Sequence, residues 1–193
     1  MIAISGKAGT GKTTLAAILV SKLGFPWIRA SFADSLKKEA ASLFDLAPAS
    51  LYTEKGKAAE FEVQPSELEH LGIHTVYPEL LSVRRILQLR GQYCRSLDRD
   101  YWVKAFAHDF FSTDNLIIDD LRYPNELDYC RDRSAYCVRL LPYSGWEPIA
   151  GDHESETALD DVSSWDMVLQ PPYGGLGEIA ETLLADYRSR GNA

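Results

Sequence analysis

Hydrophobic residues follow two patterns along the chain, and their alternation predicts an α/β fold. Short, nearly continuous apolar runs are typical of strands buried on both faces of a parallel sheet. They occur at Met1–Ser5, Phe25–Ala30, Asn115–Asp120, Ala135–Leu141 and Trp165–Gln170. Apolar residues three to four positions apart indicate helices at Thr14–Val20, Ser31–Phe44, Glu79–Ser96, Arg99–Phe111, Asn125–Arg131 and Leu176–Tyr187. The order predicts a doubly wound, five-stranded parallel sheet with helices on both faces.

Two segments lack a regular pattern. Residues 46–78 hold three prolines and two glycines that interrupt any long element, so we expect a loop-rich excursion with one short helix near Ser66–Glu69. Residues 142–154 are polar and irregular and lead into a helical turn from Glu154. We expect one domain over residues 1–193, with a substrate-binding helical region at about 46–112 and a short lid at about 142–156.

The segment between the first strand and the first helix matches the phosphate-binding P-loop, G-x-x-x-x-G-K-[ST]. It runs from Gly6 to Thr13, and the motif requires this strand–loop–helix context. Glycines let several backbone N–H groups point at a phosphate, and the start of the helix adds the positive end of its dipole. Lys12 is expected to reach the β- and γ-phosphates, and Thr13 to offer its hydroxyl to Mg²⁺. The predicted ATP-binding residues are Gly6, Lys7, Ala8, Gly9, Thr10, Gly11, Lys12, Thr13 and Thr14.

The amino-acid composition of the chain limits which binding partners and which cellular location are expected. A net charge of −8 disfavours binding to long nucleic acid, which usually requires a basic face, and suits either a small anionic substrate held by a few arginines or simple solubility. Three cysteines without C-x-x-C spacing and four scattered histidines indicate reduced thiols and no zinc site. No apolar run approaches the roughly 20 residues of a membrane span, and the first residues leave no room for a signal peptide. We therefore expect a cytoplasmic protein, and leave open whether it is a homodimer.

Further candidate residues follow the predicted strands, where ligands gather in an open parallel sheet. After the second strand, Asp34 is expected to orient or deprotonate the attacking group, or to bind Mg²⁺ through water; the structural alternative, a helix N-cap, is compatible with these roles. Lys37, one turn later, is expected either to bind a substrate phosphate or to be an ordinary exposed lysine of the helix. Asp120 ends an apolar strand and is the candidate Mg²⁺ ligand, while Asp119 points to the other face and is expected to be structural. Arg122 would neutralise charge on the transferring group, or form a salt bridge with Asp120.

The motifs, in this order and spacing, resemble the deoxynucleoside monophosphate kinases of tailed bacteriophages, a P-loop family related to the adenylate kinases. The resemblance covers most of the chain and rests on the P-loop, Ser31–Lys37, Arg85–Val103, Asp120–Glu126, Ser155–Asp160 and the last strand at Asp166. Dephospho-coenzyme A kinase and animal phosphomevalonate kinase share the scaffold and part of the pattern. The resemblance implies a P-loop NTPase fold, ATP as donor, Mg²⁺ as cofactor and a deoxynucleoside monophosphate as acceptor.

In the family resemblance, the helix with arginines at 85, 90 and 95 faces the monophosphate. Helical spacing lets Arg85, Gln88 and Arg95 line one wall, whereas Arg90 is offset and expected to be solvated. Tyr93, Trp102 and Tyr123 are candidates to stack on a base, and Trp102 is the one assigned to the substrate; each is otherwise a core aromatic. The short lid contains no arginine, unlike the long lid of adenylate kinases. Stabilisation of charge from the lid side would then come from Arg139, Arg131 or Arg133, or be weaker, and the sequence does not decide among these alternatives.

The leading hypothesis is an Mg²⁺-dependent enzyme that phosphorylates deoxynucleoside 5′-monophosphates to diphosphates with ATP, in the host cytoplasm if it is phage-encoded. A second hypothesis keeps the fold but changes the acceptor to a hydroxymethylated base in DNA or a small metabolite such as a coenzyme A precursor. A third, a non-catalytic nucleotide-binding switch, is disfavoured because the chain has no N-K-x-D motif. The base that is accepted stays open.

Overall fold

A computed structural model describes residues 1–147 and 154–191 of the chain. The chain forms two compact units: residues 1–31 with 110–193, and residues 32–109. We call them the sheet unit and the helical unit. The helical unit begins at Phe32 and not near residue 46, because the helix that follows the second strand packs against the later helices of this unit.

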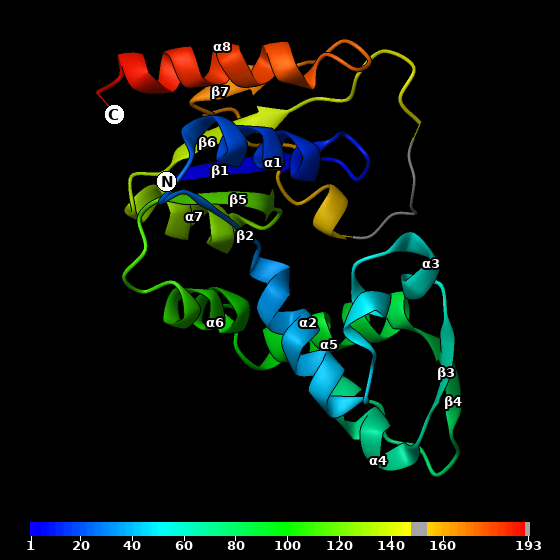
Figure 1. Ribbon diagram of the computed structural model, residues 1–193. Helices are drawn as coiled ribbons and strands as arrows, with labels where there is room; N and C mark the ends of the chain where they lie inside the picture. Colours follow the sequence, from blue (N-terminus) through cyan, green and yellow to red (C-terminus); the bar gives the residue numbers. More distant parts are fainter. Residues whose placement is uncertain (148–153, 192–193) are drawn as a thin grey trace. The chain divides into compact units, whose positions relative to one another are not determined.

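The sheet unit is built on five parallel strands in the order β2-β5-β1-β6-β7 (Figure 1). The strands are β1 (Ile2–Gly6), β2 (Ile28–Ala30), β5 (Leu116–Leu121), β6 (Tyr136–Leu140) and β7 (Met167–Leu169). Four of these strands begin and end within two residues of the predicted apolar runs, and β2 starts three residues later than expected. The predicted α/β class and the five-stranded parallel sheet are confirmed.

Helices cover the two faces of this sheet. They are α1 (Lys12–Leu23), α7 (Pro124–Asp132) and α8 (Leu176–Ser189), and a 3₁₀ turn, η3, spans Glu154–Glu156. Apolar residues of β1 and β6 share one core with Leu15 and Leu19 of α1 and with Leu183 of α8. In Figure 1, α1 and α7 lie on opposite sides of the sheet, which is the doubly wound arrangement.

The three longest helices of the helical unit, among the described residues, are α2 (Phe32–Leu43), α5 (Val83–Leu97) and α6 (Tyr101–Asp109). The segment between α2 and α5 holds η1 (Pro48–Leu51), α3 (Glu54–Lys57), β3 (Glu60–Val63), α4 (Pro65–Leu68), η2 (Glu69–Leu71) and β4 (Glu79–Ser82). Its apolar side chains, Leu51, Val63, Leu68 and Leu71 among them, share a core with Val83 and Ile86 of α5. The short helix expected near Ser66–Glu69 is present as α4.

One predicted element is wrong. The helix expected to start at Glu79 starts at Val83, and Glu79–Ser82 is a strand that pairs with β3 in an antiparallel hairpin. The side chain of Ser82 accepts a hydrogen bond from the Arg85 backbone N–H at 3.2 Å, which caps the helix at this position. Helical periodicity in Leu80, Val83 and Leu87 concealed this boundary, since a strand of four residues is too short to show its own period.

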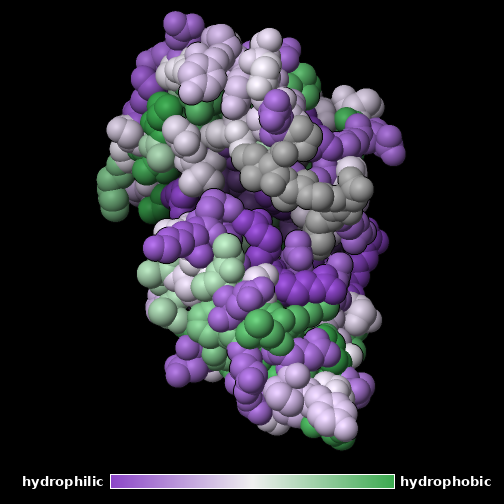
Figure 2. Space-filling view, turned by 90° about the vertical axis from the view of Figure 1, so that its right-hand side faces the viewer, coloured by the Kyte–Doolittle hydropathy of each residue, from purple (hydrophilic) through white to green (hydrophobic). Residues whose placement is uncertain are grey.

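Exposed large hydrophobic residues are spread over both units, and include Phe25 in the sheet unit and Val76, Tyr77 and Leu80 in the helical unit. Figure 2 shows that, on the face it presents, hydrophobic residues form separate groups with polar residues between them. Among the described residues, no helix has both the length and the hydropathy needed to cross a membrane.

Candidate functional site

The P-loop connects β1 to α1 and is held closely against its neighbours. A side chain at Gly6 would place its Cβ 2.5 Å from the carbonyl oxygen of Leu140 on β6, so only glycine fits there. Gly11, the N-cap of α1, has φ of +95°, a conformation that favours glycine, and its Cβ would meet Leu176 of α8 at 2.8 Å. The two glycines let the backbone curl tightly between β6 and α8, and α1 starts at Lys12 as the motif requires.

Lys12 folds back over its own loop. Its Nζ donates hydrogen bonds to the carbonyl oxygens of Gly6 at 2.8 Å and Lys7 at 2.7 Å, and the residue is 7% exposed. Burial, followed by the nearby Arg122 guanidinium, lowers the pKa of Lys12 to about 8, against the smaller opposing effects of Glu156 and Asp120. The neighbouring groups thus offset the positive charge of the Lys12 ammonium only weakly. The P-loop is therefore well suited to bind an anion. Thr13 and Thr14 are exposed in the first turn of α1.

The carboxyl end of β5 lies beside β1 in the sheet and presents two acids on opposite faces. Asp119 is 5% exposed and forms an ion pair with Arg29 of β2 at 3.5 Å, in keeping with its expected structural role. Asp120 is half-buried and accepts a hydrogen bond from the Ser31 hydroxyl at 2.5 Å. Ser31 follows β2, so the ends of β2 and β5 meet at the carboxyl edge of the sheet, as expected of ligand sites in this architecture.

Arg122 pairs with an acid that sequence reasoning did not single out. Its Nη1 donates to Oε1 of Glu156 and, at 3.3 Å, to the hydroxyl of Ser155. The second carboxylate oxygen of Glu156 accepts the backbone N–H of Ala8 in the P-loop at 2.7 Å. Burial acts to raise the pKa of Glu156, but Arg122, the Ala8 N–H and Lys12 together hold that pKa below its usual value. The expected alternative partner of Arg122, Asp120, is not the one it binds here.

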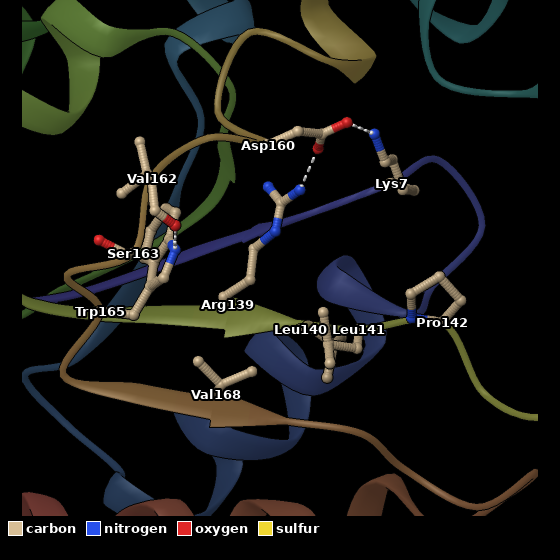
Figure 3. A pocket seen from close by; sticks show the side chains of 10 residues that line it. All are labelled: Lys7, Arg139, Leu140, Leu141, Pro142, Asp160, Val162, Ser163, Trp165 and Val168. Carbon is tan, nitrogen blue, oxygen red and sulfur yellow. Dashed lines mark hydrogen bonds and ion pairs between the residues drawn. The ribbon is translucent and has the colours of Figure 1, made fainter.

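A second ionic group flanks the P-loop on the side of β6. Lys7 binds Asp160, Asp160 binds Arg139 with Nη2···Oδ1 at 2.6 Å, and Arg139 also donates to Ser5 Oγ at 2.8 Å. Figure 3 shows the Lys7–Asp160 and Asp160–Arg139 contacts among the residues that line a pocket of about 410 Å³. The pocket is lined by Lys7, Arg139, Leu140, Leu141, Pro142, Asp160, Val162, Ser163, Trp165 and Val168. Of the three arginines proposed for the lid side, Arg139 is therefore the one linked to the P-loop.

The other two lid-side candidates are engaged elsewhere. Arg131 donates to the carbonyl and hydroxyl oxygens of Ser164, and Arg133 forms an ion pair with Asp114 at 2.9 Å. Of the predicted lid at 142–156, residues 148–153 lie outside the described residues. Within the described part, the indole N–H of Trp146 donates to the carbonyl oxygen of Ala8 at 3.1 Å, so this segment contacts the P-loop.

Two predicted acceptor-side residues lie on α2 of the helical unit. This helix starts at Phe32, so Asp34 is in its first turn and is not its N-cap, which corrects the structural alternative for this residue. Asp34 forms an ion pair with Lys37 at 3.1 Å, and the Lys37 ammonium lies 4.5 Å from the ring centre of Tyr52. Lys37 is therefore partly buried and held next to Asp34, not extended into solvent.

Arg85, Gln88 and Arg95 all lie on α5, as predicted. Arg85 is exposed, whereas Gln88 and Arg95 are partly buried beside the stripe of Val83, Ile86 and Cys94 that faces the core. A Cβ at the buried Gly91 would lie 3.1 Å from a guanidinium nitrogen of Arg95. None of the described residues forms an ion pair with Arg85. The side chains are thus placed together by one helix, and a substrate role for them stays a prediction.

The prediction for Arg90 is wrong. Its Nε donates to Glu39 of α2 at 2.7 Å, its Nη1 donates to the carbonyl oxygen of His70 at 2.6 Å, and the side chain is only 13% exposed. Arg90 therefore connects α5 to α2 and η2. The offset from Arg85 and Gln88 turns it toward a neighbouring helix and not toward water.

Trp102 is a core aromatic, which is the structural alternative given for it above. The residue is 3% exposed, packs edge-on to Tyr101, and donates its indole N–H to the carbonyl oxygen of Gly91 at 3.2 Å. Tyr123 in the sheet unit is likewise buried at 6% exposure. In the described arrangement neither ring is available to a base, so the prediction that Trp102 stacks on one finds no support.

Comparison of this chain with known protein families identifies the family to which it belongs. The profile of the deoxynucleotide monophosphate kinase family matches residues 42–172. The chain belongs to this family. A protein of Acanthamoeba polyphaga mimivirus named "Putative deoxynucleotide monophosphate kinase" is 31% identical over 179 residues, which covers 88% of this chain and 86% of the viral protein.

The kinase is therefore a phosphotransferase, and family membership implies ATP as its donor. The matched range begins after the P-loop, so the P-loop is an independent observation that leads to the same class. Among residues 1–147 and 154–191, no group of three or more His, Cys, Asp or Glu side chains could hold a metal ion. Thr13 and Asp120 nevertheless offer the oxygen donors that Mg²⁺ prefers, and Mg²⁺ in kinases takes its other ligands from phosphates and water. The residues present fit that cofactor.

Proposed function

We propose that this kinase transfers the γ-phosphoryl group of ATP to the 5′-phosphate of a free deoxynucleoside monophosphate. An oxygen of the acceptor phosphate attacks the γ-phosphorus, the bond to the β–γ bridging oxygen breaks, and ADP and the deoxynucleoside diphosphate leave. The observation that carries the proposal is the P-loop itself, with Lys12 buried in its curve, in a chain that belongs to this family.

On the donor side, we assign the phosphates to the backbone from Gly6 to Thr14. Lys12, whose ammonium binds the carbonyl oxygens of Gly6 and Lys7, would turn to the β- and γ-phosphates. Arg122 lies next to the P-loop through Glu156 and is suited to neutralise the charge of the transferring group. Both cations belong to the sheet unit, which supports a preorganised donor site.

Mg²⁺ would be held by the hydroxyl of Thr13 and, directly or through water, by Asp120. When bound, the ion would neutralise charge on the donor phosphates. The Ser31 hydroxyl, which donates to Asp120, would orient that carboxylate.

On the acceptor side, the proposed residues all belong to the helical unit. Arg85 and Arg95, with Gln88 between them on α5, would bind the dianionic 5′-phosphate, for which a guanidinium fork is well suited. Lys37 would contact the same phosphate, and its ion-pair partner Asp34 would orient the attacking oxygen. Free monophosphates and ATP are cytoplasmic metabolites, and we propose that location for the enzyme.

The test is an assay of the purified protein with ATP, Mg²⁺ and each natural or modified deoxynucleoside monophosphate in turn, with the products separated by chromatography. Formation of a deoxynucleoside diphosphate and an equal amount of ADP supports the proposal, and the preferred acceptor identifies the base. ADP formed only when a coenzyme A precursor or another phosphorylated alcohol is present would move the activity to a different acceptor class. ATP binding without turnover on any acceptor would favour a non-catalytic switch.

A further inference from the structure

Glu156 binds two parts of the phosphate-binding machinery. Its carboxylate accepts the P-loop N–H of Ala8 at 2.7 Å and a hydrogen bond from Arg122 Nη1. These donors, a backbone amide of the P-loop and a neighbouring guanidinium, are the ones that a phosphate oxygen would use. A carboxylate is negatively charged like a phosphate and has a similar spacing between its oxygens. It can therefore accept hydrogen bonds from the Ala8 N–H and Arg122 in the way that a phosphate would.

We propose that Glu156 is an internal competitor of the donor nucleotide: its carboxylate occupies part of the phosphate site, and ATP displaces it on binding. This inference rests on the proposed function, in which ATP is the ligand of the P-loop. Two anions cannot share the Ala8 N–H and Arg122 at hydrogen-bond distance without strong repulsion. Glu156 therefore lowers the ATP affinity of the enzyme while keeping the empty loop and Arg122 in place.

The segment that carries Glu156 is anchored independently of this carboxylate. The Lys7 ammonium binds the backbone carbonyl oxygen of Glu156 and the carboxylate of Asp160, and Arg139 binds Asp160 from the other side. Figure 3 shows the Lys7–Asp160–Arg139 part of this anchor. A change confined to the Glu156 carboxylate should consequently leave the segment where it is.

The test compares Glu156→Gln with Glu154→Gln, which removes the same charge from an exposed position in the same 3₁₀ turn. ATP binding is measured by calorimetry with Mg²⁺ and without acceptor. Because a glutamine amide keeps the size of the side chain but not its charge, we expect Glu156→Gln to bind ATP about 10-fold more tightly than the natural protein. Glu154→Gln is expected to bind within about 2-fold of it, since surface charges couple weakly.

Equal ATP affinity in the natural protein and Glu156→Gln would overturn the inference, and so would weaker binding. Loss of kcat in Glu156→Gln with unchanged affinity would instead make Glu156 a positioning residue for Arg122. If circular dichroism shows that Glu156→Gln is unfolded, Glu156→Ala is used: it removes the carboxylate altogether, so it should also tighten binding. None of these results depends on the acceptor, so a failure to form deoxynucleoside diphosphates would count against the proposed function and not against this competition.

Discussion

At the scale of single residues, the site depends on ionisable groups that the fold keeps partly desolvated. Lys12 is the clearest, because its ammonium is buried against the carbonyl oxygens of Gly6 and Lys7. A charge in such a position is costly to keep, and an incoming phosphate relieves that cost. The two residue-scale predictions follow from this state of Lys12.

The first concerns the rate of transfer. We expect Lys12→Met to lower kcat/KM by about 10²- to 10³-fold, since one preorganised charge contact to the transferring group is lost. The matched control is Lys22→Met at the other end of α1, where the lysine is paired with Glu181 on the surface and activity should be unchanged. Steady-state kinetics and circular dichroism on both variants check this; a Lys12→Met enzyme retaining a third of the natural activity would remove Lys12 from the mechanism.

The second concerns pH. With a pKa of about 8 in the free enzyme, Lys12 loses its proton as the pH rises above that value, whereas bound phosphates would restore the proton. ATP binding should therefore weaken from about pH 8 upward and take up protons, and Lys12→Met should lose this dependence. Calorimetry in buffers of different ionisation enthalpy measures the uptake; affinity that is flat between pH 7 and 9.5 would contradict the prediction.

The lowered pKa of Lys12 also determines how this residue changes the stability of the folded protein with pH. Lys12 has a lower pKa in the folded protein than its ordinary 10.5, so between about 8 and 10.5 the folded form binds fewer protons than the unfolded chain. The contribution of this group to stability is therefore unfavourable below pH 8 and improves as the pH rises through that window.

At the scale of secondary-structure elements, α5 serves two different tasks with two sets of arginines. Arg85 is exposed and Arg95 lies at the flank of the core stripe, whereas Arg90 reaches Glu39 on α2 and His70 in η2. Position along one helix thus separates the proposed substrate contacts from a structural connection. Each set gives one prediction.

For the substrate set, Arg85→Ala or Arg95→Ala should raise the KM for the monophosphate by about 10- to 150-fold and leave the KM for ATP nearly unchanged. The control is Arg84→Ala, next to Arg85 but paired with Glu54 on the surface. Kinetics with each substrate varied in turn separates the two constants. An increase confined to the ATP KM would assign these arginines to the donor.

For the structural set, Arg90→Ala should lower the free energy of unfolding by about 2 kcal/mol, because Glu39 loses a partly buried partner and the His70 carbonyl loses a donor. Arg84→Ala, whose ion pair is exposed, should change stability by less than about 0.5 kcal/mol. Urea unfolding of the three proteins measures the difference. Equal stability of Arg90→Ala and the natural protein would show that the contacts of Arg90 do not stabilise the fold, as for a solvated surface arginine.

At the scale of the whole molecule, the two compact units divide the proposed chemistry. The donor residues belong to the sheet unit, and the proposed acceptor residues belong to the helical unit, which is one insertion between Ser31 and Phe110. The net charge of −8 is a property of the whole chain, and it disfavours a polyanion as acceptor.

This charge leads to a prediction about DNA. We expect no transfer of label from γ-³²P ATP to a 5′-hydroxyl DNA oligonucleotide, whose internal phosphates are diesters with a single charge, under conditions that label a free monophosphate. Deoxynucleosides without a 5′-phosphate should also be inert, since the acceptor arginines would then lack an anion. Label in the oligonucleotide and in none of the monophosphates would establish a DNA-modifying kinase.

The sequence by itself determined the parts of this protein that depend on local order. The P-loop, the five strands and most helices follow from short-range spacing, because periodicity and glycine placement act within a few residues. The same local rules placed Asp120 at the end of β5 and grouped Arg85, Gln88 and Arg95 on one side of a helix.

Only the tertiary structure decided which distant side chains meet. Glu156 lies 148 residues from Ala8 and 34 from Arg122, and no local pattern marks it as the acid at the P-loop. Arg90 was misjudged for the same reason, because whether an arginine is solvated depends on what packs against it. The burial of Trp102, left open by the sequence, also depends on its neighbours. The strand at Glu79–Ser82 likewise exists because β3 pairs with it. Long-range packing and pairing energies set these outcomes, and they have no signature within a window of neighbouring residues.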